Sequence, residues 1–177
     1  MIYNGIDYDS VKALIENRYN DCYREAETKG YDLPKIDIEW DLKGSHAGQF
    51  CVRFARKYFR VNLELAKQNL EDYLKQVVPH EFSHYIVNAV AAKSYFGMPK
   101  SHGWEWKNAM IRVFGLDPKR CHSYDTSSVA RRHARPYVYK CNCTEHKITA
   151  ILHQRIMMGQ HYRCNCCKSR ITFVRMA

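Results

Sequence analysis

Acidic residues are almost absent from the last third of this 177-residue chain. Residues 119–177 contain twelve Lys and Arg but only two acids, Asp125 and Glu145, whereas residues 1–118 balance sixteen basic residues against sixteen acids. The formal net charge of +10 therefore lies entirely in the last third. Such a concentrated positive charge favours a polyanionic partner, of which nucleic acid is the most common. A merely solubilising surface is the alternative.

The chain also lacks any long apolar run. Its apolar stretches are shorter than the roughly 20 residues that a membrane-spanning helix needs. Residues 1–10 show neither the cationic nor the apolar segment of a secretory signal peptide. We therefore expect a cytoplasmic protein with no membrane partner; the sequence does not indicate its oligomeric state.

Hydrophobic residues make up 46% of the composition, enough for a buried core. Apolar spacing predicts a helix from Asp9 or Ser10 to about Lys29, three strands near residues 36–40, 50–54 and 58–63, and helices over 70–96 and 103–114. Short connections between the strands suggest an antiparallel sheet. Pro79 predicts either a kink in the first of the two later helices or two helices that meet there. The organisation expected is a domain at 1–118, a basic linker at 119–136 and a small module at 137–177.

Residues 80–84 read H-E-F-S-H, the pattern H-E-x-x-H. On a helix, residues four positions apart differ by about 40° in azimuth, so His80 and His84 point the same way and can bind one Zn²⁺. Glu81 lies on the adjoining flank, where it can take a proton from a zinc-activated water and deliver it to a leaving amine. Ordinary surface histidines are the alternative. The apolar flanks at 77–78 and 85–87 argue against it, because polar groups in a buried helix need partners.

A catalytic zinc site needs a third protein ligand and one open position. His102 follows a Gly-Met-Pro turn and precedes the second helix, so the chain can reverse and return it to the first. Glu105, on that second helix, is the rival ligand. We favour His102 because Gly103, which follows it, permits a close approach of the two backbones.

Five of the eight cysteines lie between residues 141 and 167. In a cytosolic chain such a cluster binds metal more often than it forms disulfides. Cys141 and Cys143, followed after twenty residues by Cys164 and Cys167, predict a structural zinc site. Cys143-x-x-His146 is an alternative first pair, His153 and His161 are possible substitutes, and Cys166 is expected to be a bystander. Three isolated cysteines are expected to act as small apolar residues: Cys22, Cys51 and Cys121.

These motifs together resemble the SprT family of zincin-type metallopeptidases. The resemblance rests on V-V-P-H-E-F-S-H at 77–84, S-H-G-W-E-W-K at 101–107, Gly44 with Ala47-Gly48, F-R-V-N at 59–62, and the cysteine pairs with their flanking residues. It implies an α+β, zincin-like fold: a helix, a short antiparallel three-stranded sheet, two metal-holding helices and a zinc-ribbon-like C-terminal β module.

The resemblance also implies a chemistry. The zinc ligands would be His80, His84 and His102, with Glu81 as the catalytic base and Trp106 as a packing residue. Eukaryotic relatives of the Spartan type cleave proteins covalently trapped on DNA. We therefore expect a peptidase with one catalytic and one structural Zn²⁺, a polypeptide substrate and DNA as a partner. A catalytically silent zinc protein that binds nucleic acid or another partner is the alternative.

Overall fold

The computed structural model describes residues 5–92, 97, 99–127, 129 and 136–176. The chain is α+β and divides into two compact units, residues 1–130 and 131–177, each considered by itself. The elements of the first unit are α1 (Tyr8–Glu27), β1 (Asp37–Glu39), β2 (Gly48–Arg53), β3 (Arg56–Val61), α2 (Leu63–Gln68), α3 (Leu70–Asp72), the π-helical turn η1 (Tyr73–Val77), α4 (Val78–Ala91) and α5 (Trp104–Phe114).

The sheet of the first unit is mixed rather than antiparallel. Its strand order is β1-β3-β2; β2 and β3 form an antiparallel hairpin, but β1 pairs in parallel with β3. The expected antiparallel sheet is therefore wrong for β1. Residues 40–47 are long enough to pass the end of β3 and begin β2 on its far side. The Asn62 side chain holds this loop by donating to the carbonyl oxygens of Gly44 at 2.8 Å and His46 at 3.1 Å.

The second and third strands begin and end earlier than expected, and the reasons are clear at their ends. Phe54 continues the alternating pattern of β2, yet it lies in the hairpin turn with a positive φ of 53° and is 94% exposed. The third strand ends at Val61, because the side chain of Asn62 caps α2 by accepting from the Leu65 amide. Local alternation therefore located the strands but not the turn or the short helix between them.

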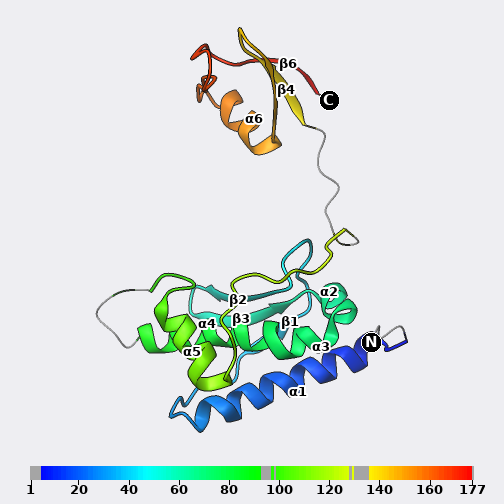
Figure 1. The fold of residues 1–177 in the computed structure, drawn as a ribbon, viewed down its shortest axis with the longest axis vertical. Helices are drawn as coiled ribbons and strands as arrows, with labels where there is room; N and C mark the ends of the chain where they lie inside the picture. Colours follow the sequence, from blue (N-terminus) through cyan, green and yellow to red (C-terminus); the bar gives the residue numbers. More distant parts are fainter. Residues whose placement is uncertain (1–4, 93–96, 98, 128, 130–135, 177) are drawn as a thin grey trace. The chain divides into compact units, whose positions relative to one another are not determined.

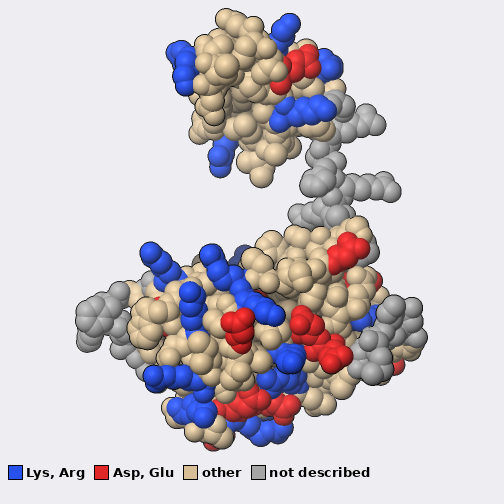
Figure 2. All heavy atoms as spheres, viewed as in Figure 1, with Lys and Arg blue, Asp and Glu red and all other residues tan. Residues whose placement is uncertain are grey.

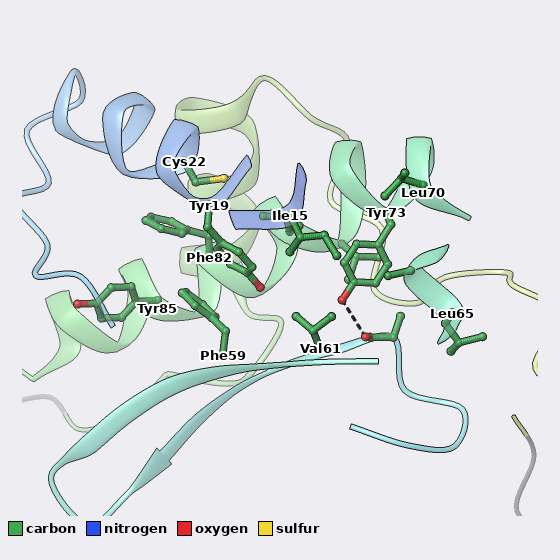
Figure 3. Packing of buried hydrophobic residues seen from close by; sticks show 14 of the residues in the cluster. Ile15, Tyr19, Cys22, Phe59, Val61, Leu65, Leu70, Tyr73, Phe82 and Tyr85 are labelled. Atoms are coloured by element: carbon green, nitrogen blue, oxygen red, sulfur yellow. Dashed lines mark hydrogen bonds between the residues drawn. The ribbon is translucent and has the colours of Figure 1, made fainter. Parts of the chain in front are cut away.

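Helix α1 packs against the sheet together with α4 (Figures 1 and 3). Its N-cap is Asp7, not Asp9 or Ser10, since the Asp7 side chain accepts from the Ser10 amide at 2.8 Å. The ring of Tyr19 stacks on Phe59 of β3 with a centroid distance of 4.3 Å. One stripe of α1 is buried: Val11, Ile15, Tyr19, Cys22 and Ala26. This stripe has the helical spacing that the sequence predicted.

The expected kink before Pro79 takes the form of a π-helical turn. In η1 the Val78 amide donates to the Tyr73 carbonyl, a bond that spans five residues. Pro79, next in line, has no amide hydrogen to give to Leu74. The Arg18 side chain replaces it, because its Nε donates to the Leu74 carbonyl at 3.1 Å. Helix α1 thus supports the point at which α4 begins.

The second unit contains β4 (Tyr137–Lys140), β5 (Glu145–Ile148), α6 (Ala150–Met157) and β6 (Thr172–Met176). The strands form an antiparallel sheet in the order β5-β4-β6. Six apolar residues are buried in the described part of this unit: Val138, Tyr139, Cys141, Ile148, Cys164 and Ile171. Two of these six are cysteines, so this unit has little apolar material with which to fold.

Part of the expected linker belongs with the first unit. Within residues 119–125, the Lys119 carbonyl, the His122 ring and the Tyr124 hydroxyl all bond to residues of that unit. Cys121 in this segment is exposed, so it does not pack as the small apolar residue that the sequence led us to expect, whereas Cys22 is buried and Cys51 half-buried. Within the described residues, no helix combines the length and the hydropathy that crossing a membrane requires.

Candidate functional site

Three histidine side chains converge where α4 meets the start of α5. The Nε2 atoms of His80, His84 and His102 lie 3.3, 3.2 and 3.1 Å apart around the triangle. A tetrahedral Zn²⁺ bound at 2.0–2.1 Å places two nitrogen ligands about 3.3–3.4 Å apart. The three rings therefore fit one zinc ion, and each offers a single ligand atom to it.

His102, rather than Glu105, completes this three-histidine cluster, since Glu105 is not part of it. The Gly103 amide donates to the Lys100 carbonyl at 2.9 Å, which closes the turn that carries His102. A Cβ atom on Gly103 would lie 3.0 Å from that carbonyl, so glycine permits the turn, as the sequence suggested. One turn of α4 thus positions the rings of His80 and His84, and a tight reversal of the chain positions the ring of His102.

The Trp106 side chain packs against all three histidine rings of the cluster. Its indole is fully buried and lies 4.6, 5.7 and 4.7 Å, between ring centroids, from His80, His84 and His102. Its Nε1 donates to the backbone carbonyl of His80 at 3.2 Å. The packing role expected for Trp106 is therefore what the structure shows, and one indole restrains all three rings.

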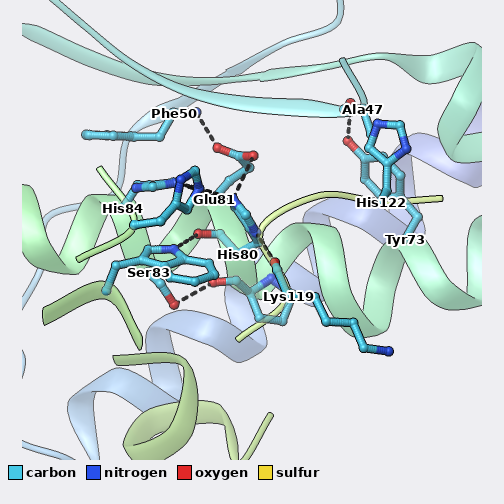
Figure 4. A network of polar contacts seen from close by, with 12 residues as sticks. Ala47, Phe50, Tyr73, His80, Glu81, Ser83, His84, Lys119 and His122 are labelled. Carbon is cyan, nitrogen blue, oxygen red and sulfur yellow. Dashed lines mark hydrogen bonds and ion pairs between the residues drawn. The ribbon is translucent and has the colours of Figure 1, made fainter. Parts of the chain in front are cut away.

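The histidines are held neutral, the form that binds metal. Burial lowers the pKa of His80 to about 4, and His102 adds to the effect. Burial, with His80 and His102, lowers the pKa of His84 to about 3. Nδ1 of His80 lies 3.2 Å from the Lys119 carbonyl, which only accepts (Figure 4). Nδ1 therefore carries the proton, and the Nε2 lone pair is free for a metal.

Glu81 faces the same space from the other flank of α4. Its Oε2 accepts a 2.7 Å hydrogen bond from the Phe50 amide of β2, and its Oε1 lies 4.0 Å from Nε2 of His80 (Figure 4). One carboxylate oxygen is thus held while the other faces the cluster. Burial raises the pKa of Glu81 to about 7, and the Phe50 hydrogen bond opposes that rise. The carboxyl group is suited to accept and to release a proton.

Gly48 in β2 leaves room for Glu81. A Cβ atom at this position would lie 2.9 Å from Cγ of Glu81 and 3.0 Å from Cγ1 of Val77. We expect Gly48→Ala to lower the free energy of unfolding by about 1–3 kcal/mol, the usual cost of overpacking. Urea denaturation measures this. Gln49→Ala, next to it and exposed, should change stability by less than about 0.5 kcal/mol. Equal stability of Gly48→Ala and the parent chain would contradict the close approach.

Four cysteines of the second unit form a separate cluster. The Sγ atoms of Cys141, Cys143, Cys164 and Cys167 all lie within 4.8 Å of one another. Cys141 and Cys143 are 3.3 Å apart, and Cys143 and Cys164 are 3.6 Å apart. A tetrahedral zinc with Zn–S bonds of 2.3 Å gives sulfur–sulfur distances of about 3.8 Å. The donor set and its spacing therefore fit one structural zinc ion.

Other possible ligands lie near this four-cysteine cluster without belonging to it. His146, the alternative ligand, is outside it, and its Nε2 lies 3.2 Å from Sγ of Cys141. Hydrogen bonds from Ser169 lower the pKa of Cys167 to about 5, which favours the thiolate that binds metal. Cys166 is exposed and outside the cluster, as expected. His153 instead stacks on Tyr137 at 3.7 Å.

Comparison with known proteins agrees with this arrangement. The SprT-like family matches residues 13–122. Among curated relatives, Protein SprT of Pseudomonas putida (strain W619) is 35% identical over 151 residues, covering 83% of this chain and 86% of the relative. Protein SprT of Shewanella oneidensis is 31% identical over 147 residues, covering 82% and 88%. The chain belongs to the SprT-like family.

The SprT-like match contains the three-histidine cluster, Glu81 and the segment up to His122, while the four cysteines lie beyond it. Two contacts in this SprT-like site escaped prediction from the sequence. The Lys119 carbonyl and the Phe50 amide are backbone groups, so no residue type marks them. Gly48, which the sequence analysis used only as part of the family resemblance, is the one residue type that marks the approach of Glu81 to β2.

Proposed function

We propose that this SprT-like protein is a zinc-dependent metallopeptidase with a zincin-like catalytic unit. One observation carries the proposal: three neutral imidazole nitrogens 3.1–3.3 Å apart share a space with one unengaged carboxylate oxygen of Glu81. A purely structural site has four protein ligands, whereas three leave a position open. No fourth ligand belongs to the cluster within the described residues.

Each group then has a distinct task in the hydrolysis of a peptide bond. When bound, zinc supplies Lewis-acid chemistry, lowering the pKa of a water molecule and polarising a carbonyl. His80, His84 and His102 hold the ion, and Trp106 restrains their rings. Oε1 of Glu81 accepts the proton of the attacking water and later delivers it to the leaving amine. Oε2 stays hydrogen-bonded to the Phe50 amide, which keeps the carboxylate aimed at the cluster.

The polypeptide substrate has a natural binding edge. Strand β2 lies at the edge of the sheet, and its Phe50 amide reaches Glu81. An extended peptide can add to such an edge through backbone hydrogen bonds. Recognition by backbone groups would permit many different protein substrates.

The zinc content of His102→Ala tests the metal centre. We expect two zinc ions per chain in the parent protein and one in this variant, since the cysteine cluster is untouched. Peptide hydrolysis should fall together with the missing zinc. Atomic absorption and cleavage of an unfolded protein substrate measure the two quantities. Two zinc ions in His102→Ala would remove His102 from the site.

We further propose that the second unit binds DNA, which would bring the peptidase to polypeptides held on or crosslinked to DNA. Glu145 is its only acid, and Figure 2 shows several Lys and Arg side chains on the visible face of this unit. Six exposed cations form no ion pair within the described part of this unit: Lys140, Lys147, Arg155, Arg163, Lys168 and Arg170. Unpaired cations are free to neutralise phosphates.

Charge-matched variants test DNA association. Replacing Lys140, Arg155 and Arg170 together by Gln should weaken duplex binding and reduce the slope of log affinity against log salt by about 2.7, or 0.9 per contact. The control replaces three exposed lysines of the first unit, Lys29, Lys43 and Lys75, and lowers the net charge equally. Fluorescence anisotropy measures both. An equal loss of DNA affinity in the two triple variants would mean that net charge alone, and not the second unit, determines binding. DNA binding without any proteolysis would favour a catalytically silent zinc protein.

A further inference from the structure

Residues 119–124, here called the strap, follow α5 and reach the three-histidine cluster. The Lys119 carbonyl accepts from Nδ1 of His80 at 3.2 Å. This hydrogen bond selects the tautomer whose Nε2 can bind metal. A carbonyl supplied by a segment outside any helix or strand orients a ligand only if that segment is itself held in place.

His122 holds the strap to the loop before β2. The Tyr124 amide donates to Nδ1 of His122 at 3.3 Å, so Nε2 carries the proton and donates to the Ser45 carbonyl at 3.0 Å. The rings of His122 and Tyr124 stack with centroids 4.5 Å apart. The same loop leads to Ala47, whose carbonyl accepts from the Tyr73 hydroxyl at 2.9 Å, and to Gly48 beside Glu81.

Tyr124 holds the other end of the strap to α3. Its hydroxyl donates to Oδ2 of Asp72 at 2.7 Å, and its ring packs against the main core. Asp72 immediately precedes η1, the turn that leads into Pro79 and His80. The strap therefore contacts three places at once: the ligand His80, the helical segment that carries it, and the loop leading to the strand that holds Glu81.

We propose that the strap is a positioning element for the metal centre, in which His122 and Tyr124 hold the Lys119 carbonyl in register with His80. This rests on the proposed zinc site but goes beyond it, because neither side chain is a ligand in the three-histidine cluster. With the strap released, His80 loses its Nδ1 partner, and the ring can turn its Nε2 away from the other two nitrogens. Metal affinity then falls although all three ligands remain.

Two pairs of variants in the full chain distinguish a loss of zinc affinity caused by release of the strap from a general loss of stability. Tyr124→Phe removes only the hydroxyl bonded to Asp72, and its match, Tyr8→Phe, removes an equivalent 2.7 Å bond to Glu64 elsewhere in the same unit. His122→Gln keeps an amide donor for the Ser45 carbonyl, whereas His122→Leu does not. The chain loaded with zinc is equilibrated against chelator-buffered zinc, and bound zinc is counted. The zinc ion that the His102→Ala chain lacks is the one bound by the three histidines. Urea unfolding of each metal-free variant reports its stability.

Because removing a partner of a metal ligand typically costs about 10–100-fold in affinity, and these variants loosen rather than delete it, we expect losses of at least about threefold in Tyr124→Phe and His122→Leu. Tyr8→Phe and His122→Gln should stay close to the parent. Equal affinity in Tyr124→Phe and Tyr8→Phe would overturn the proposal, as would a loss that merely follows the urea midpoint. A His102→Ala chain that keeps both zinc ions would instead remove His102 from the zinc site, which is a failure of the proposed function and not of the strap.

Discussion

Glu81→Gln is expected to reduce peptide hydrolysis by at least about 10²–10⁴-fold, the usual contribution of a positioned proton-transfer group, while both zinc ions stay bound. Glutamine has the shape of glutamate, and its carbonyl oxygen can still accept from the Phe50 amide. The atom facing the histidines is then an amide nitrogen, which cannot take a proton from water. Cleavage of an unfolded protein substrate and zinc content per chain, measured on one sample, test both parts.

Glu105→Gln is the matched control for this prediction. It makes the same chemical change on α5, at the carboxylate that rivalled His102 as a ligand, and Glu105 lies outside the cluster. Zinc content and hydrolysis should both remain at the parent level. Full activity in Glu81→Gln would remove Glu81 as the base. A lost zinc ion in Glu105→Gln would return Glu105 to the ligand set.

The sequence predicted the convergence of the three histidines well because its geometry is mostly local. A spacing of four on a helix places His80 and His84 together whatever surrounds them. His102 depends on one turn, and Gly103, visible in the sequence, is what permits it. The position of the Glu81 carboxylate is not local: its partner is an amide of β2, 31 residues earlier, and backbone groups leave no mark on residue type.

The sheet shows where local patterns stop being informative. Alternation located three strands, but it carries no information on which strand pairs with which. The parallel pairing of β1 depends on a loop that crosses the end of β3, held by side-chain hydrogen bonds from Asn62. The strap was missed for a similar reason. Its polar and basic composition is that of a linker, and its function depends on distant partners such as Asp72 and Ser45.

Cys164→Ser is expected to unfold the second unit while the first stays folded. Structural zinc contributes about 10–16 kcal/mol to the folding of small zinc-binding domains. The small buried core of this unit, which itself includes Cys141 and Cys164, cannot replace that contribution. Zinc content should fall from two ions per chain to one. Limited proteolysis should then cut within residues 137–176 and spare residues 5–92.

Cys166→Ser distinguishes loss of a ligand from loss of any cysteine. Like Cys164→Ser, it replaces a cysteine sulfur by oxygen, and it lies only two residues away. Cys166, however, is exposed and outside the cluster. We expect it to keep both zinc ions and the protease resistance of the parent. If Cys164→Ser remained folded with one zinc ion, aromatic contacts such as Tyr137 on His153 would be supporting the unit. If both variants unfolded, the four-cysteine assignment would be wrong, and a ligand set that includes Cys166 would have to replace it.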